Sequence, residues 1–494
     1  MINKHHLIIS LLILRLTLCP LNGQIPSNYQ NIKKPINYQT LTNYLTAIEK
    51  PGFIELTEAG KSVEGRSLHL VHLFHNNQLK KLKLFFYAQQ HGNEPAGKDA
   101  LIYLIKKIKE DPAYLPDYVD LWIMPMVNPD GAEHNQRRNA NDMDLNRDHR
   151  LLSQPEIQTL HETARKIMPH VAIDCHEFTR DNKDYADHGW QKWPLIMMDC
   201  ANNPLYSQCL YETGVEWIDR IKPVMHEKNI NYTRYYVGGL PPDDELRFST
   251  LEPDDGRNGI GAYSVLSFII ESGIFRNAAN PDANLTERIE AYLTIFDQFI
   301  HASERYEHDI QIVENARKAT LQDFIPTNYF WGSQPGSVHD VNVIDKETDQ
   351  TIRVKTANFM HRRIVKNSVR RPEKYLIPRE YIDVFTPLLD RHAIEYKTLK
   401  KGRQIELEAV KYIRFETEFD DVYNRYENRV ISEVQKPESI TVEKGSLLIP
   451  VEQKFPWKVV LLLEPSMMYS LFSDTFFRES IDKKNRFPIY RVFK

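Results

Sequence analysis

Two residues of types that bind zinc follow an apolar run. In "LFFYAQQHGNEPAG" (84–97) the apolar part ends at Ala88, and His91 and Glu94 come next. A catalytic zinc commonly has three protein ligands, among them imidazole nitrogen and carboxylate oxygen, and one water molecule. A His-x-x-Glu pair also fits an ordinary polar loop after a strand, so on its own it predicts little.

His176 is the candidate for a third ligand. It lies near the end of the strand-like run "VAIDCHEF" (171–178), a position that also suits a hydrogen-bonded core histidine. With the His-x-x-Glu pair it completes a set of two histidines and one glutamate that leaves a coordination position open for water. Asp174 and Glu177 are candidates to orient the ligands, although either could simply face solvent.

Glu271 is the candidate for a general base. It follows an apolar run in "SFIIESGIF" (267–275), where loss of hydration disfavours its charge and raises its pKa. Such a carboxylate can accept a proton near neutral pH from a metal-activated water. The alternative is a glutamate at a strand end that pairs with a lysine or arginine.

A basic segment, "NPDGAEHNQRRNANDMDLNRDH" (128–149), supplies candidates for anion binding. It contains Arg137, Arg138, Asn146 and Arg147. Guanidinium groups can bind a carboxylate through two hydrogen bonds or stabilise a developing oxyanion. A solvated surface is the alternative for such a cluster.

Alternating strands and helices must position these residues. Apolar runs typical of buried strands occupy 81–88, 119–127, 170–177 and 263–272, and helical spacing occupies 97–110, 153–167 and 286–306. Ser153 is the expected N-cap of the second helix. The pattern predicts an α/β fold with a mixed, mostly parallel sheet flanked by helices. Ligand sites in such sheets lie at the carboxyl ends of strands, where the candidates fall.

The pattern of apolar and polar residues changes along the sequence and divides it into three parts. We expect a signal peptide in 1–23, a catalytic domain in 24–310 and an accessory α+β or β-rich region of one or two small domains in 311–494. The last region is expected to hold paired strands in 337–359, a helix and then a strand in 379–399, and β structure in 433–450.

The N-terminus predicts export to the periplasm or beyond. "LIISLLILRLTLC" (7–19) follows basic residues and is too short and interrupted for a membrane span, so none is expected in the mature chain. A lipoprotein anchored at Cys19 is the less favoured alternative, because Leu18 and Pro20 flank it.

Composition excludes several classes of protein. The 494 residues carry 63 basic and 67 acidic side chains, a net charge of −4, which does not favour nucleic acid as a partner. The four cysteines form no Cys-x-x-Cys pair, so a thiolate zinc site is not expected. Cys200 and Cys209 could form a disulfide or remain as buried free thiols.

Six motifs in order resemble those of the zinc metallocarboxypeptidases, the funnelin family. They are "HGNE" (91–94), "NPDG" (128–131), "RRN" (137–139), "DLNRD" (144–148), "IDCHE" (173–177) and "FIIESG" (268–273), and the resemblance covers about residues 40–305. Segments 371–399 and 445–472 are similar to the C-terminal extension of large exported bacterial members.

This resemblance implies a role for each motif. The ligands of one zinc ion per chain would be His91, Glu94 and His176, with Asp144 orienting the ring of His91. Arg137 would polarise the scissile carbonyl, Glu271 would be the base, and Asn146 and Arg147 would bind the terminal carboxylate of a peptide substrate. The alternatives are a zinc amidase or peptidase acting on cell-wall stem peptides or another acylated amine, and an inactive binding module.

One departure from the family pattern and one charged residue concern the substrate pocket. Asp148 stands where the family has asparagine, which adds a negative charge near the anion-binding arginine. Arg257 lies in the segment expected to line the pocket for the terminal side chain, and could favour an acidic side chain unless Asp254 and Asp255 neutralise it.

The tyrosine that caps the substrate in this family has no secure counterpart. Tyr263 is near the base in sequence but fits a core position, and Tyr235 and Tyr236 are the alternatives.

Overall fold

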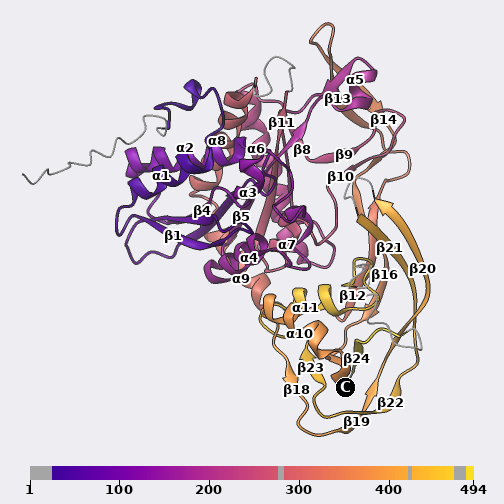
Figure 1. Ribbon diagram of the computed structural model, residues 1–494. Helices are drawn as coiled ribbons and strands as arrows, with labels where there is room; N and C mark the ends of the chain where they lie inside the picture. The colour runs from indigo at the N-terminus through magenta and orange to yellow at the C-terminus, as the bar shows by residue number, and fades with distance from the viewer. Residues whose placement is uncertain (1–24, 276–282, 421–424, 472–485, 494) are drawn as a thin grey trace, which may run out of the picture.

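The computed structural model describes residues 25–275, 283–420, 425–471 and 486–493. The expected signal peptide and Cys19 lie outside these ranges. Figure 1 shows the first part of the chain gathered around one twisted sheet, with the C-terminal region packed against one side of it. Among the described residues, no helix is both long and apolar enough to cross a bilayer.

The central sheet has eight strands and is mixed, as predicted. Its order is β1 (Ile54–Lys61), β2 (Ser67–Phe74), β4 (Val119–Met124), β3 (Leu82–Ala88), β5 (Val171–Thr179), β11 (Leu266–Ile274), β7 (Ile196–Cys200) and β8 (Tyr232–Arg234). The four central strands β4, β3, β5 and β11 are parallel, and β1, β2 and β7 each run antiparallel to a neighbour.

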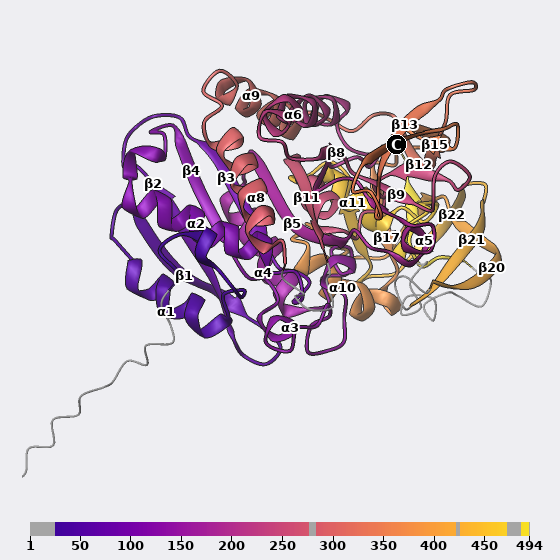
Figure 2. The same cartoon turned by 90° about the horizontal axis from the view of Figure 1, so that it is seen from above.

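Helices cover both faces of the sheet. The helices in the first part of the chain are α1 (Tyr38–Ile48), α2 (Ala96–Glu110), α3 (Pro129–Glu133), α4 (Pro155–Ile167), α5 (Lys183–Asp187), α6 (Gln208–Glu227), α7 (Gly256–Gly261), α8 (Leu285–Ile300) and α9 (Tyr306–Lys318). Figure 1 shows α2 and α8 on one side of the sheet and α4 and α7 on the other, and Figure 2 gives the view from above.

The pleat of β3 divides its side chains between the two cores. Leu84, Phe86 and Ala88 pack under α2 and α8, whereas Phe85 and Tyr87 pack against α4 and α7. Because both faces are covered, the strand is apolar throughout rather than alternating.

The same pleat places the polar residues of β5 and β11. Ile173 and Cys175 face α2, so Asp174 and His176 point to the opposite face. Glu271 is paired in register with His176 on the neighbouring strand. Their polar side chains therefore meet near the carboxyl ends of two central strands.

Two sequence predictions about helices need correction. Ser153 is not the N-cap of α4: the helix begins at Pro155, and Asp148 accepts hydrogen bonds from the backbone N–H groups of Ser153 and Gln154 at 2.8 and 2.7 Å. The helix predicted over 286–306 ends at Ile300, where α8 stops.

The expected domain limit at residue 310 falls inside α9. Ile310, Val313 and Ala316 on this helix belong to the same core as the sheet. The first structural unit therefore continues to Lys318 before the C-terminal region begins.

The C-terminal region is rich in β structure. Its strands are β12 (Phe324–Gly332), β13 (His339–Asp345), β14 (Thr351–Thr356), β15 (Phe359–Met360), β16 (Arg362–Arg370), β17 (Lys374–Ile377), β18 (Lys397–Thr398), β19 (Arg403–Leu407), β20 (Val410–Asp420), β21 (Arg425–Val434), β22 (Glu438–Val442), β23 (Leu447–Pro450) and β24 (Tyr490–Val492). Its helices are α10 (Ile382–Arg391) and α11 (Pro456–Leu463). The expected hairpin in 337–359 is present as β13 and β14.

Strands from the two parts of the chain pair with each other. β13 pairs with β6 (Trp190–Lys192), and β15 pairs with β10 (Leu246–Phe248), which in turn pairs with β9 (Tyr236–Gly238). The C-terminal region therefore supports segments of the first part rather than folding apart from it.

The described cysteines are free thiols. Cys200 is buried and Cys209 is exposed, so they form no disulfide, and only one of the two is the buried thiol that was expected.

Candidate active site

Three predicted metal ligands meet at the carboxyl ends of β3 and β5. Nδ1 of His91 lies 2.8 Å from Oε1 of Glu94 and 3.1 Å from Nδ1 of His176, and the second oxygen of Glu94 lies 3.0 Å from Nδ1 of His176. All three side chains are buried. His91 follows β3, Glu94 comes just before α2, and His176 belongs to β5.

The spacing of these atoms fits a tetrahedral metal ion. An ion about 2.0–2.1 Å from nitrogen and oxygen donors separates them by about 3.3 Å. The three printed separations are 2.8, 3.0 and 3.1 Å, so the donors need to move apart by only a few tenths of an ångström. Two imidazoles and one carboxylate are also ligands that zinc accepts, with a fourth position left open.

Two carboxylates hold the other nitrogen of each imidazole. Nε2 of His91 lies 3.0 Å from Oδ1 of Asp144, and Nε2 of His176 lies 3.0 Å from Oδ1 of Asp174. Because a carboxylate only accepts, each Nε2 carries the proton and each Nδ1 presents its lone pair to the metal position. Asp144 was predicted for this place, and Asp174 takes the equivalent place for the second histidine.

The charges of these groups perturb one another. Burial would raise the pKa of Glu94, but the two imidazoles lower it to about 2. Burial likewise opposes the charge of His176, yet Asp174 and Glu94 raise the pKa of this imidazole well above its usual range. The centre is thus a strongly cation-attracting group of carboxylates around two imidazoles.

Glu177 supports the ligand turn rather than facing solvent. Its backbone N–H donates to Oε2 of Glu94 at 3.0 Å, and its side chain accepts from the backbone N–H of Ala96 and pairs with buried Arg288. These contacts fix the start of α2 and hence the position of Glu94.

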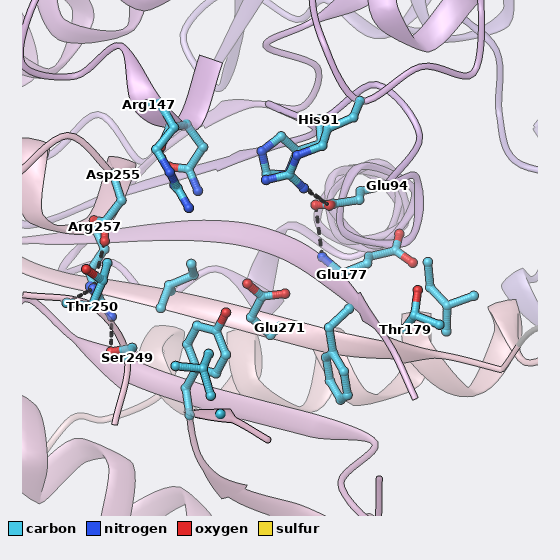
Figure 3. A pocket seen from close by; sticks show the side chains of 18 of the residues that line it. His91, Glu94, Arg147, Glu177, Thr179, Ser249, Thr250, Asp255, Arg257 and Glu271 are labelled. Atoms are coloured by element: carbon cyan, nitrogen blue, oxygen red, sulfur yellow. Dashed lines mark hydrogen bonds and ion pairs between the residues drawn. The ribbon is translucent and has the colours of Figure 1, made fainter. Parts of the chain in front are cut away.

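Glu271 lines the same cavity as the metal ligands. This cavity has a volume of about 630 Å³, and Figure 3 shows Glu271 facing the space below His91 and Arg147. Burial raises the pKa of Glu271 to about 7. One of its oxygens has no hydrogen-bond partner, and it forms no ion pair with any described residue. The geometry thus disfavours the structural salt bridge that was the alternative for this residue.

Arg137 lies beside the candidate metal ligands. Its Nη1 is 3.2 Å from Nδ1 of His91, and its Nη2 forms an ion pair with Asp144 at 3.0 Å. A bound cation would repel the near end of this guanidinium, so we expect Nη1 to swing away while the contact with Asp144 is kept. Arg138 instead donates to the backbone carbonyl of Asp142, away from the cavity.

Asn146 and Arg147 line the same cavity as Glu271. Oδ1 of Asn146 accepts from the backbone N–H of Gly256 at 2.7 Å, which ties the short helical turn Leu145–Arg147 to the start of α7. Figure 3 shows Arg147 across the cavity from Glu271.

Arg257 reaches the cavity wall, but its charge is matched there. Nη2 donates to Asp255 at 2.7 Å and to the backbone carbonyl of Thr250 at 2.7 Å, and Nη1 donates to Ser249. The side chain is fully buried. Of the two alternatives left open by the sequence, this pairing favours neutralisation of the guanidinium by Asp255 over a preference for an acidic substrate side chain.

Asp148 accepts hydrogen bonds from the loop that follows it. It caps the loop before α4, and burial raises its pKa to about 6. The aspartate at position 148 therefore has a local role, because its carboxylate accepts hydrogen bonds from two backbone N–H groups.

Of the three tyrosines considered, Tyr235 is the one that lines the cavity. Burial and then the charge of Glu271 raise its pKa well above the usual range. Tyr263 is a core residue that meets His161, and Tyr236 packs among apolar side chains beside Phe359.

Comparisons with known proteins agree with this geometry. The profile of the family described as Zinc carboxypeptidase matches residues 41–166. Carboxypeptidase 2 of Trichophyton rubrum is 24 % identical over 490 residues, which cover 93 % of this chain and 87 % of that protein. Probable carboxypeptidase 2 of Trichophyton verrucosum is 29 % identical over 475 residues, which cover 90 % of this chain and 88 % of that protein.

Residues 41–166 match the zinc carboxypeptidase family, and the similar proteins that cover most of the chain are carboxypeptidases. Members of this family are metal-dependent peptide hydrolases, and the three adjacent donor groups provide a place for a metal ion. A crystal structure of a metallo-carboxypeptidase from Burkholderia cenocepacia superposes with a TM-score of 0.44 at 20 % identity, over 55 % of this chain and 70 % of that one.

Part of the carboxypeptidase cavity was not predicted. Gly238, Glu245, Arg247 and Ser249 line the wall opposite the metal ligands. They lie on or beside the three-residue strands β9 and β10, which have no readable periodicity. Their position depends on pairing with β15, more than a hundred residues later in the chain.

Proposed function

We propose that the protein is an exported, zinc-dependent carboxypeptidase that removes the C-terminal residue from peptides with a free carboxylate. The observation that carries this proposal is the content of one cavity. Its lining includes His91 and Glu94 of the three converging metal donors, and the carboxylate-binding candidates Asn146 and Arg147. It also includes the buried carboxylate Glu271, which forms no ion pair among the described residues.

Zinc, when bound by His91, Glu94 and His176, would act as a Lewis acid and lower the pKa of a bound water to about 7. The residues of the chain supply the rest. Glu271 accepts a proton from the attacking water and returns it to the departing amine, which balances the hydrolysis. Arg137 donates to the carbonyl oxygen as negative charge develops there.

Asn146 and Arg147 would hold the terminal carboxylate. A guanidinium can make two parallel hydrogen bonds to a carboxylate, which fixes the position of the last peptide bond. The distance between this anchor and the metal site would then decide which bond is cut. Such positioning restricts cleavage to one residue at a time from the C-terminus.

Product analysis by mass spectrometry tests the proposal. The protein is reconstituted with zinc and incubated with matched peptides that end in a free carboxylate or an amide, and with cell-wall stem peptides. We expect single residues to leave the free peptide, and the amidated peptide to react far more slowly. Internal cleavage, or equal rates on both peptides, would contradict carboxylate recognition.

Export is a separate proposal that rests on the apolar run at 7–19. We expect the protein in the periplasm or medium of its host, with an N-terminus near residue 24. Recovery of the full chain from the cytoplasm of the native host would contradict it.

A further inference from the structure

A hydrogen-bond network of buried side chains begins at Asp174, beside the candidate metal site, and ends at Tyr263. Nε2 of Gln90 lies 2.8 Å from Oδ2 of Asp174, and Oε1 of Gln90 lies 2.8 Å from Nε2 of His149. Nδ1 of His149 lies 2.9 Å from Nε2 of His161, whose Nδ1 is 2.8 Å from the hydroxyl of Tyr263. The first member, Asp174, is the carboxylate that holds His176.

The direction of donation along this hydrogen-bond network is fixed by Asp174. Asp174 as a carboxylate only accepts, so Gln90 must present its amide N–H to Asp174 and its carbonyl to His149. At the other end Nη1 of Arg165, which only donates, lies 3.2 Å from the hydroxyl of Tyr263. The direction set by Gln90 makes Nε2 of His161 a donor to His149, so Nδ1 of His161 accepts and the hydroxyl, which also accepts from Arg165, donates to it.

Both histidines are consequently restricted to one tautomer. His149 donates from Nε2 to Gln90 and accepts at Nδ1, and His161 donates from Nε2 and accepts at Nδ1. Each ring thus carries one proton, and burial lowers the pKa of both imidazoles well below the usual range. Gln90, His149 and His161 have no exposed surface, so water does not compete for these bonds.

Residues of the C-terminal region pack against Tyr263, the last member of this hydrogen-bond network. The ring of Phe455 packs edge-on against Tyr263 at 4.9 Å, and Nζ of Lys458 lies 4.8 Å from the centre of the same ring. His392 lies near His161, with ring centres 6.3 Å apart. This region therefore covers the side chains that stand behind the metal site.

We propose that Gln90 and His149 are positioning residues for His176: with His161 and Tyr263 they fix Asp174, and Asp174 fixes the ring that presents Nδ1 to the metal. This inference rests on the proposed metal site. Removal of a ligand's direct hydrogen-bond partner typically changes metal affinity or activity by 10–100-fold, so a group that holds this partner should act at the lower end of that range. The effect should decrease with distance from Asp174, an order that simple loss of core packing would not produce.

Metal affinity of a graded set of variants tests the proposal. The zinc dissociation constant of the full chain is measured by competition with a chromophoric chelator. We expect Gln90→Leu to raise it about 10-fold or more, His149→Leu by less, and Tyr263→Phe by about 3-fold or less. His149→Gln should recover part of the loss, because its amide can still donate to Oε1 of Gln90.

His170→Leu is the matched control for removing a buried histidine. His170 accepts from the backbone N–H of Lys83 near the start of β5, at the opposite end of the strand from His176. This variant should lower stability without changing zinc affinity. Equal affinities for wild type, Gln90→Leu and His149→Leu would overturn the positioning role, whereas failure of the wild type to bind zinc would overturn the proposed function instead.

Imidazole ¹⁵N spectra of the metal-free protein test the hydrogen-bond network without any zinc. His149 and His161, assigned by their substitutions, should both show the neutral Nε2–H tautomer at pH 7. Tyr263→Phe, which deletes a single oxygen, should shift the Nδ1 signal of His161. An Nδ1–H tautomer or a doubly protonated ring at either position would contradict the proposed direction of donation.

Discussion

Glu271→Gln should inactivate the enzyme and stabilise its metal-free form. Glutamine has nearly the same shape but cannot accept the proton of the attacking water, so we expect a loss of at least ~10²-fold in kcat, with zinc still bound. The second effect follows from burial, which raises the pKa of Glu271 from 4.5 to about 7.

The sign of the stability effect depends on pH. Between about pH 4.5 and 7 the folded protein holds a proton at Glu271 that the unfolded chain has released, so the free energy of unfolding falls as pH rises through this window. Above pH 7 the buried charge costs about 3 kcal/mol, at about 1.4 kcal/mol per pKa unit. At pH 5 most of this cost is absent.

Denaturant unfolding at two pH values measures this cost. In the presence of a chelator, Glu271→Gln should increase the free energy of unfolding at pH 8 by about 2–3 kcal/mol more than at pH 5. Glu162→Gln is the control, since that carboxylate is exposed and pairs with Lys166 on the surface. A gain that is the same at both pH values, or an active variant, would refute the assignment of Glu271 as the buried base.

Three further predictions concern zinc affinity, recognition of the substrate carboxylate, and the fall of kcat/KM at acidic pH. Asp174→Asn should lower zinc affinity about 10–100-fold, measured by chelator competition, because Nε2 of His176 loses its charged acceptor. Arg147→Ala should lower kcat/KM for peptides with a free carboxylate about 10–100-fold, from the loss of charged hydrogen bonds, and leave amidated peptides nearly unaffected. The kcat/KM of the zinc enzyme should fall as pH decreases through the pKa of Glu271, at a pH below about 7 because the bound cation favours the carboxylate.

The strands that carry the candidate ligands were predictable because both of their faces are covered. Such strands are continuously apolar, so the sequence predicted them at 81–88, 170–177 and 263–272. The structure has β3, β5 and β11 at these places, with ends that differ by a few residues. The polar residues that interrupt or follow these runs, His91, His176 and Glu271, then converge because parallel strands end at the same edge.

Features that depend on contacts between distant segments were not predictable. The residue pattern changes after about residue 310, yet α9 packs on the first core because its Ile310 and Val313 contact apolar residues of that core. His149 and His161 are twelve residues apart and meet only because the turn before α4 folds back. No spacing rule anticipates their contact with Gln90.

Asp148 and Arg257 show why charge alone is a poor guide to a role. Asp148 was expected to add a negative charge near the anion-binding arginine, and Arg257 was a candidate to bind the terminal side chain of the substrate. Asp148 instead accepts backbone N–H groups before α4, and Arg257 is neutralised by Asp255 two residues earlier. Local hydrogen bonds of this kind compete with ligand binding and are visible only once the loop conformation is known.

Diffraction data collected on both sides of the zinc absorption edge, from crystals of the zinc-reconstituted protein, test the central claim most directly. The account predicts one anomalous peak about 2.0–2.1 Å from Nδ1 of His91, Nδ1 of His176 and the carboxylate of Glu94. It also predicts that Glu271 faces the open coordination position. A peak bonded to different atoms, or no peak among these three residues, would contradict the account.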